Sequence, residues 1–379
     1  MSHGPLAGLR VVELGGIGPL PFCAMLLADL GAEVIRVDRP MDAGRPGFPV
    51  LHRGRRSIAV NLRDPAGVAA VLRLVENADA VIESFMPGVA ERLGLGPEQC
   101  LKLNSRLVYG RISGWGQDGP KAREPGRDIN FIALSGALHA IGPATSAPVV
   151  PLNLVGEFGG GGLMLAFGLV SGLLQAARTG IGQVVDAAMT DGAATLLAMA
   201  YAFSGTGKWC DERGSNLIDG AAPFYTTYRC SDGEYIAVGA LEPQCYAELI
   251  VNLSLENHRA FSRQHDRQLW PAMRMKLAEV FAKQPRNAWA AFFEGTNACV
   301  TPVLSLSEAP LHPHNAARST FRIGPSGAPE PAPAPHFSRT PAGDPAPAPR
   351  VGADTRKVLA EAGMQDSEID ALLNKRILG

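Results

Sequence analysis

A strand–loop–helix–strand pattern near the N-terminus constrains the fold of this chain more than any other feature. Residues 9–14 form an apolar, β-branched run that ends in a glycine-rich loop at 15–19. Residues 22–30 have the composition of a helix, which Gly31 ends, and residues 33–37 form a second apolar run. A short helix between two such runs is typical of the crossover in a parallel βαβ unit.

The same alternation continues along the chain. It predicts a strand at 57–61, a helix at 65–75 and strands at 80–83 and 107–112. Strands that alternate with helices in this way predict an α/β fold, a Rossmann-like, doubly wound domain with a parallel sheet. Two more helices are expected, one opening at the glycines 159–162 and one over 186–200.

The loop after the first strand invites a comparison with dinucleotide-binding loops. Gly16 and Gly18 precede a helix, and Asp38 follows the second strand. Pro21 occupies the third position of the fingerprint, where glycine permits close packing of helix and strand. The pattern therefore argues against a nicotinamide cofactor and favours a tight turn that a ligand phosphate or pantetheine group can approach.

Composition narrows the class of protein and its partners. The 379 residues include 35 Lys and Arg against 36 Asp and Glu, which gives a net charge of −1. Without a basic excess, we expect neither a nucleic-acid nor a membrane partner. The apolar run 163–174 is interrupted by glycines and is shorter than a membrane span. The six scattered cysteines are expected to be small buried side chains, with no metal site. No secretory signal is recognisable, so a cytoplasmic location is expected.

The sequence also predicts the domain organisation. Residues 1–200 form the large domain, which residues 335–379 complete. Residues 220–323 change in character, with strand-like runs at 224–230 and 234–239 followed by helical stretches, and form a smaller α+β domain. The Pro- and Ala-rich segment 324–350 is expected to be a semi-rigid, extended linker.

Several motifs resemble one family over nearly the whole chain. They are PLAGLRVVEL at 5–14, MLLADLGAEVIRVDRP at 25–40, GWGQDGP at 114–120, DINFIALSGALHAIG at 128–142 and PLNLVGEFGGGG at 151–162. The chain is similar in these motifs to the type III CoA-transferase superfamily (CaiB/BaiF type), and most closely to its alpha-methylacyl-CoA racemase branch. The resemblance implies an acyl-CoA substrate, no cofactor besides its coenzyme A, and an interlocked homodimer in which both chains build each site.

The resemblance also indicates the catalytic positions. The branch uses a histidine and an aspartate as opposing bases and a glutamate that orients the histidine. Arg127, Glu157 and Glu242 occupy these three positions here. The backbone amide of Asp128 is expected to contact the thioester oxygen. Because arginine has a pKa above ~12 and so stays protonated, Arg127 cannot act as a base.

Three hypotheses about function remain open. In the favoured one, Glu157 removes and returns the proton alpha to the thioester, through an enolate. In the second, Glu157 attacks the thioester as the carboxylate nucleophile of a CoA-transferase. In the third, the chain binds acyl-CoA without turnover. A steroid side chain, a branched fatty acid and a dicarboxylate are all compatible acyl groups, and Arg127 slightly favours the last.

Basic side chains are the candidates for binding the CoA phosphates. Arg39 and Arg92 match positions where the family places such residues, and Arg55 and Arg56 follow as weaker candidates. The glycines 159–162 have two possible roles, which are backbone amides that stabilise negative charge or simple close packing of the helix.

Overall fold

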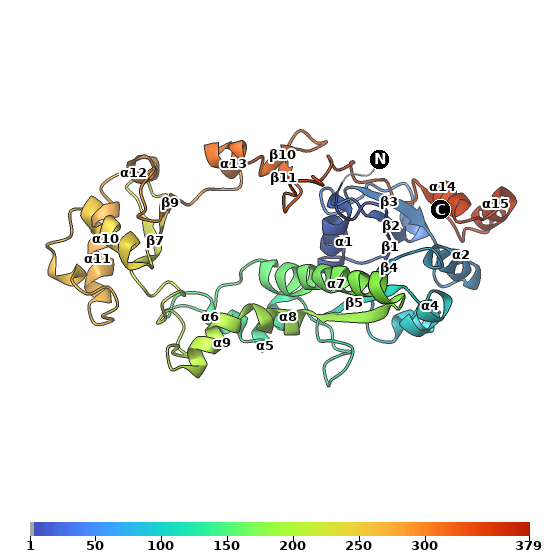
Figure 1. The fold of residues 1–379 in the computed structure, drawn as a ribbon, viewed down its shortest axis with the longest axis horizontal. Coiled ribbons are helices and arrows are strands. Elements are labelled where there is room, and N and C mark those ends of the chain that lie inside the picture. Colours follow the sequence, from blue (N-terminus) through green and yellow to red (C-terminus); the bar gives the residue numbers. More distant parts are fainter. Residues whose placement is uncertain (1–3) are drawn as a thin grey trace. The chain divides into compact units, whose positions relative to one another are not determined.

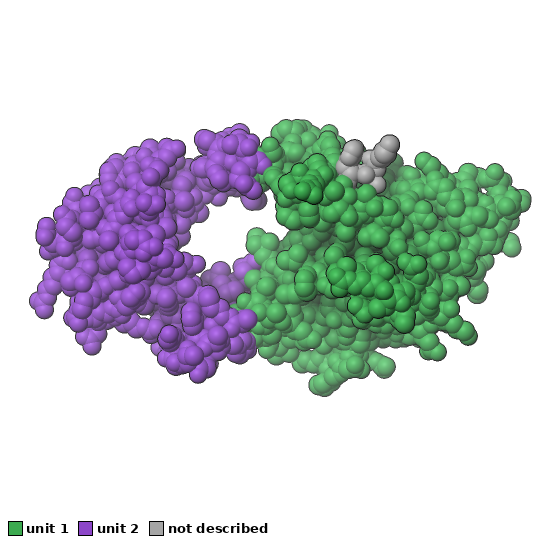
Figure 2. All heavy atoms as spheres, viewed as in Figure 1, with its two compact units in different colours: residues 1–135, 152–197, 319–379 green, residues 136–151, 198–318 purple. Residues whose placement is uncertain are grey.

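The computed structural model describes residues 4–379. The chain divides into two compact units, which Figure 2 shows in separate colours. Unit 1 comprises residues 1–135, 152–197 and 319–379, and unit 2 comprises residues 136–151 and 198–318. Residues 136–151 belong to unit 2, whereas the predicted large domain includes them. Residues 319–334 belong to unit 1, whereas the prediction assigns them to the small domain up to residue 323 and to the linker from residue 324.

Unit 1 contains a six-stranded parallel sheet with the order β3-β2-β1-β4-β5-β6. The strands are β1 (Arg10–Leu14), β2 (Glu33–Asp38), β3 (Arg55–Ala59), β4 (Ala80–Glu83), β5 (Val108–Ser113) and β6 (Gln183–Ala188). The direction of winding reverses between β1 and β4. In sheets of this kind, ligands bind outside the carboxyl ends of the strands at that reversal.

Helices cover both faces of this sheet (Figure 1). Because side chains alternate along a strand, Val11 and Val12 of β1 belong to two separate cores. The core of Val11 includes α1 (Pro19–Asp29) and α7 (Met164–Thr179). The core of Val12 includes α2 (Pro65–Val75), α4 (Pro97–Leu103), α14 (Thr355–Glu361) and α15 (Asp366–Asn374). The C-terminal helices therefore complete the core of unit 1.

Shorter elements join these layers. They are η1 (Pro40–Asp42), α3 (Val89–Arg92), α5 (Asp128–Leu134), the π-helix η2 (Leu154–Leu163), α8 (Met189–Leu196), β10 (Phe321–Ile323) and β11 (Pro329–Pro331). The segment 324–350, predicted as an extended linker, pairs in part with the rest of unit 1. Its β11 pairs with β10, and Ala346 and Pro349 accept backbone hydrogen bonds from Gly54 and Gly47.

The region around residue 186 differs from the expected helix over 186–200. Residues up to Ala188 extend the sheet as β6, parallel to β5, and the helical region is divided into α8 and α9 (Ala198–Gly205). The helix prediction was wrong here because β6 is an edge strand, and its first residues are exposed and carry little strand pattern.

The apolar run at 163–174 is part of a longer helix than the sequence indicates. η2 and α7 form one continuous helix, Leu154–Thr179, which by length and composition alone could cross a membrane. In the structure, its residues Leu165 and Leu169 are buried in the core of unit 1. It packs there against β5 and β6, as a core helix of an α/β fold does.

Unit 2 has its own sheet and core. β7 (Tyr225–Arg229), β8 (Tyr235–Gly239) and β9 (Val300–Pro302) form an antiparallel sheet. The other elements are α6 (Ala137–Ala140), α10 (Pro243–Asn252), η3 (Arg259–Phe261), α11 (Trp270–Phe281), α12 (Arg286–Phe293), η4 (Ala309–Leu311) and α13 (Pro313–Ala317). Its core is aromatic, with Phe281 stacked on Tyr228 and edge-on to Trp289.

Candidate functional site

Two predicted site residues, Asp128 and Glu157, are in contact near the carboxyl edge of the parallel sheet, and Arg127 directly precedes Asp128. Arg127 and Asp128 begin α5, which follows the carboxyl end of β5, and Glu157 lies in the first turn of η2. The loop after β1 reaches the same place, since Gly18 lies against the Glu157 carboxylate. This is the edge at which a doubly wound sheet binds its ligands.

Both ends of Glu157 are held by hydrogen bonds. Its backbone N–H donates to Asp128 Oδ2 at 2.6 Å, and Asn153 Nδ2 donates to its Oε2 at 3.0 Å. The side chain is half-buried. The next residue, Phe158, stacks on Phe22 of α1 with ring centroids 4.3 Å apart. Glu157 is therefore a positioned carboxylate that remains open to a ligand.

Gly18 supplies the space that this carboxylate occupies. A Cβ at residue 18 would lie 2.9 Å from Glu157 Oε2, and the residue has a φ of +65°, which side-chain-bearing residues rarely adopt. From the sequence, this glycine was predicted only as part of a tight turn. Its contact with Glu157 joins two segments far apart in sequence.

The glycines of η2 serve close packing. A Cβ at Gly160 would lie 2.6 Å from the backbone N of Ala193 in α8, and one at Gly162 would lie 2.7 Å from the carbonyl oxygen of Pro19. Both glycines are buried. Of their two predicted roles, these contacts support packing, which brings η2 against α1 and α8 and so determines where Glu157 lies.

The carboxylate of Asp128 is buried and has a structural role, in addition to the backbone amide that the sequence predicted to contact the thioester. The exposed fraction of the residue is 7%. Oδ2 accepts the Glu157 N–H, while Oδ1 is buried without a hydrogen-bond partner among residues 4–379. The side chain thus links the start of α5 to the start of η2. This role is not predictable from the sequence, because it depends on a contact between residues 29 positions apart.

Arg127 precedes α5 with an exposed side chain. Its backbone N–H donates to Asn130 Oδ1 at 3.0 Å, and its Nη1 donates to the carbonyl oxygen of the adjacent Gly126 at 2.8 Å. Glu242 belongs to unit 2, where it is exposed and directly precedes α10. Within unit 1, the structure therefore brings Asp128 and Glu157 into contact, and Arg127 directly precedes Asp128 in the chain.

The four arginines proposed for phosphate binding have different surroundings. Arg39 directly follows β2, is 76% exposed and pairs with Asp42 at 3.0 Å. Arg92 ends α3 and is exposed, without an ion pair in the part of the chain that the structure describes. Both follow carboxyl ends of strands, β2 and β4, on the edge where the site lies.

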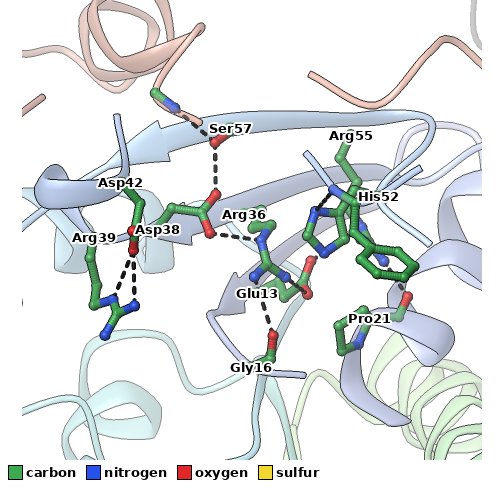
Figure 3. A network of polar contacts seen from close by, with 12 residues as sticks. Glu13, Gly16, Pro21, Arg36, Asp38, Arg39, Asp42, His52, Arg55 and Ser57 are labelled. Carbon is green, nitrogen blue, oxygen red and sulfur yellow. Dashed lines mark hydrogen bonds and ion pairs between the residues drawn. The ribbon is translucent and has the colours of Figure 1, made fainter. Parts of the chain in front are cut away.

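Arg55 is buried in a charged network, as Figure 3 shows. It lies on β3, its Nε is 3.2 Å from Glu13 Oε2, and it donates to the carbonyl oxygen of Pro21. The side chains of Arg55 and Glu13 have no exposed surface. Burial lowers the pKa of Arg55, although Glu13 opposes that shift. In this position, its guanidinium does not reach solvent and is not free to bind a phosphate.

Arg56 is the next residue of β3 and points to other partners. Its Nη1 pairs with Glu33 at 2.7 Å and with Glu361 of α14 at 2.5 Å. These pairs join the central sheet to the C-terminal helices. Arg55 and Arg56 were predicted to share one role, but their side chains have different environments because side chains alternate along a strand.

The rest of this network reaches the glycine-rich loop. Arg36 Nη1 pairs with Glu13 at 2.6 Å, its Nε pairs with Asp38 at 2.8 Å, and its Nη2 donates to the carbonyl oxygen of Gly16 at 3.2 Å (Figure 3). This group was not predicted from the sequence. The signal available was the presence of charged residues at inward positions of otherwise apolar strands, Glu13 in RVVEL and Arg36 in EVIRVD.

The cysteines correct one expectation. Cys23, Cys100 and Cys230 are buried, as predicted, whereas Cys245 is half-buried and Cys210 and Cys299 are exposed. Among residues 4–379, no group of three His, Cys, Asp or Glu side chains is arranged to hold a metal ion.

Unit 1 is an α/β fold with a positioned carboxylate near the point where the winding of its parallel sheet reverses. This arrangement is typical of a protein that binds a small ligand and transforms it. The model of CoA-transferase family III matches residues 6–355. The chain belongs to this family, which confirms the resemblance of its motifs.

Close relatives are racemases. The chain is 47% identical to the alpha-methylacyl-CoA racemase of Mus musculus and 45% identical to that of Homo sapiens, in each case over 98% of this chain and 97% of the relative. Among solved structures, a CAIB/BAIF family protein from Brucella suis matches with a TM-score of 0.80 and 27% identity, over 95% of this chain and 100% of the other. The two racemases are enzymes of the isomerase class, which agrees with the activity predicted from the sequence.

Proposed function

We propose that this chain binds an acyl-CoA and exchanges the proton alpha to its thioester, with Glu157 as the base. The observation that supports this best is the carboxylate itself, which Asn153 and Asp128 hold at the ligand-binding edge of the sheet. The similarity to alpha-methylacyl-CoA racemases over 98% of the chain supports a 2-methyl-branched acyl-CoA as the substrate.

The proposed step is a proton transfer. A Glu157 oxygen takes the alpha proton, the C–H electron pair moves into the thioester and forms an enolate, and the proton then returns to carbon. A carboxylate within hydrogen-bond reach of the proton is the first requirement for this step. Return from the same face exchanges the proton, whereas inversion needs a donor on the opposite face. We assign that role to Glu242 or to water, since a guanidinium is not a general acid or base in proteins.

Hydrogen–deuterium exchange at the alpha carbon tests the proposal. A pure 2-methylacyl-CoA is incubated with the enzyme in D₂O and analysed by mass spectrometry, with Glu157→Gln as the variant. We expect one deuterium per molecule with the wild-type chain and a rate lower by ~10³-fold or more in the variant, since loss of a general base typically costs 10²–10⁴-fold. If the substrate binds and gains no deuterium, the proton-transfer function is wrong.

CoA transfer is the second candidate, and the family supports it. In that reaction, a Glu157 oxygen attacks the thioester carbonyl, the C–S bond breaks, and an acyl-enzyme anhydride forms with release of CoA as the thiolate. Intact-protein mass spectrometry after incubation with acyl-CoA distinguishes the two. Alpha exchange without a Glu157 adduct supports the isomerase, and an adduct with ping-pong kinetics supports the transferase. Binding without either reaction supports the third hypothesis, an acyl-CoA-binding protein.

We also propose a homodimer. The outer side of α7 and the edge strand β6 expose large apolar residues: Phe167, Val170, Leu174 and Val184. Apolar residues gathered over one helix and an open sheet edge are typical of a surface that another chain covers. We further propose that Arg39 and Arg92 bind the CoA phosphates, and that the reaction needs no cofactor besides the coenzyme A of its substrate.

A further inference from the structure

The guanidinium of Arg127 has no counter-ion in the described part of the chain. Its one hydrogen bond goes to the neighbouring carbonyl of Gly126, and its side chain is exposed. The buried arginines Arg36, Arg53 and Arg111 of unit 1 are instead neutralised by Glu13, Asp29 and Glu83, respectively. Arg127 therefore presents a full positive charge and free N–H donors to a ligand.

The residue that carries this charge directly precedes Asp128, which contacts the reacting end of the site. Arg127 is bonded through the backbone to Asp128, whose carboxylate accepts the Glu157 N–H at 2.6 Å. If Glu157 takes the proton alpha to the thioester, Arg127 neighbours the acyl group. The CoA phosphates are separated from the thioester by the long pantetheine arm, so an arginine at this position is unsuited to bind them.

We propose that Arg127 selects acyl-CoA substrates whose acyl chain ends in a second carboxylate. This inference rests on the proposed function of Glu157 and adds a substrate class to it. A guanidinium offers two parallel N–H donors that match the two oxygens of a carboxylate, which provides both charge and direction. A carboxylate on the substrate supplies the counter-ion that the described residues do not.

A matched pair of substrates tests the selection. One is 2-methylsuccinyl-CoA, with the thioester on the carboxyl group next to the methyl-bearing carbon, and the other is 2,4-dimethylpentanoyl-CoA, in which an isopropyl group replaces the carboxylate. The readouts are kcat/KM for alpha-deuterium exchange and Kd for each ester. We expect the wild-type chain to prefer the diacid by at least ~10-fold, the scale of a charge-assisted hydrogen bond.

Substitutions at residue 127 test the assignment. In Arg127→Gln, we expect the ratio of kcat/KM for the diacid ester to that for the neutral ester to fall by ~10–100-fold. Arg127→Lys should retain part of this preference, because it keeps the positive charge but not the two parallel N–H donors. Arg123→Gln is the control, since Arg123 is an exposed arginine in the same loop, and its ratio should match the wild type.

Each outcome separates the two proposals. A wild-type ratio near one, or a ratio unchanged in Arg127→Gln, overturns the selection even when exchange is fast, and Glu157 then remains the base. Absence of exchange with both esters overturns the proposed function, and the Kd ratio then decides the role of Arg127. If Arg127→Gln weakens free CoA as much as the diacid ester, the arginine binds a phosphate and the selection is wrong.

Discussion

At the scale of single residues, the site depends on the space that Gly18 leaves for the Glu157 carboxylate. The glycine lies on a loop after β1, and the glutamate lies on η2, more than a hundred residues later. Because Oε2 is 2.9 Å from the position that a Cβ would take, any larger residue at 18 must displace Glu157. The hydrogen bond from Asn153 to the same oxygen would be lost with that movement.

We therefore predict that Gly18→Ala lowers the rate of alpha exchange by ~10²-fold or more, since displacing a catalytic group by ~1 Å can cost that much. The control is Gly44→Ala, because Gly44 also has a positive φ, +80°, but nothing lies within 4 Å of its Cβ position. Both variants should also lose stability, by ~1–3 kcal/mol, because a residue with a side chain is strained at a positive φ. Chemical denaturation and the deuterium-exchange assay measure the two effects. Equal activity in both variants would contradict the proposed contact.

At the scale of elements, a buried ionic network connects β1, β2 and β3 beneath the glycine-rich loop. Glu13, Arg36 and Arg55 come from these three strands and lie where an α/β sheet is usually apolar. Charges removed from water are stable only with partners, so losing one partner is costly. Through Arg36 and the carbonyl of Gly16, the network also fixes the loop that carries Gly18.

Replacement by leucine should affect the buried Arg55 and the exposed Arg39 differently, lowering stability in the first and CoA binding in the second. Arg55→Leu leaves Glu13 without one of its two cations and should lower the free energy of unfolding by ~3 kcal/mol or more. Arg39→Leu removes an exposed ion pair, which is worth less than ~1 kcal/mol. Arg39→Leu should instead weaken CoA binding. Urea denaturation and calorimetric titration with CoA measure both. Weaker CoA binding in a stable Arg55→Leu variant would instead make Arg55 a phosphate ligand.

His52 makes the stability of this region depend on pH. Burial, together with Arg36 and Arg55, lowers its pKa to about 3, and its Nδ1 accepts the N–H of Phe48 at 3.0 Å. The ordinary pKa of histidine in an unfolded chain is ~6.5, so between the two values the unfolded chain binds more protons. His52 therefore destabilises the fold progressively as the pH falls from ~6.5 toward 3.

We predict that His52→Gln loses less stability than the wild type between pH 6.5 and 4.5. Stability at each pH is measured by urea denaturation. The control is His314→Gln, because His314 is exposed and its loss should leave the pH profile unchanged. A wild-type profile in the His52 variant would show that His52 is accessible to protons in the folded chain.

At the scale of the whole molecule, the exposed apolar side of α7 requires an explanation. Phe167 is 72% exposed and Leu174 is 53% exposed, on a helix whose opposite side is buried in the core. If a second copy of the chain covers this surface, Phe167→Asp with Leu174→Asp should produce a monomer. Sedimentation velocity measures the state. Leu306→Asp, at a residue 96% exposed in unit 2, is the control and should leave the assembly unchanged. A wild-type monomer would contradict the dimer.

Much of unit 1 follows from local sequence patterns. The β-branched runs and the helices between them predicted five of the six strands, because each pattern reflects burial within one element. β6 was not predicted, because its pairing with β5 is a long-range contact and its exposed residues do not alternate between apolar and polar. The motifs were sufficient to identify the family, since they extend over nearly the whole chain.

The sequence by itself determined the class of fold, the family and the identity of the candidate base, Glu157. Only the tertiary structure decided what surrounds that base: Gly18 against its carboxylate, Asp128 on its backbone, and Arg127 exposed while Arg55 is buried. The physical reason is that apolar periodicity and glycine positions are local properties of the chain. The partner of a charged side chain depends on which distant segments the fold brings within a few ångströms, and no local pattern records that.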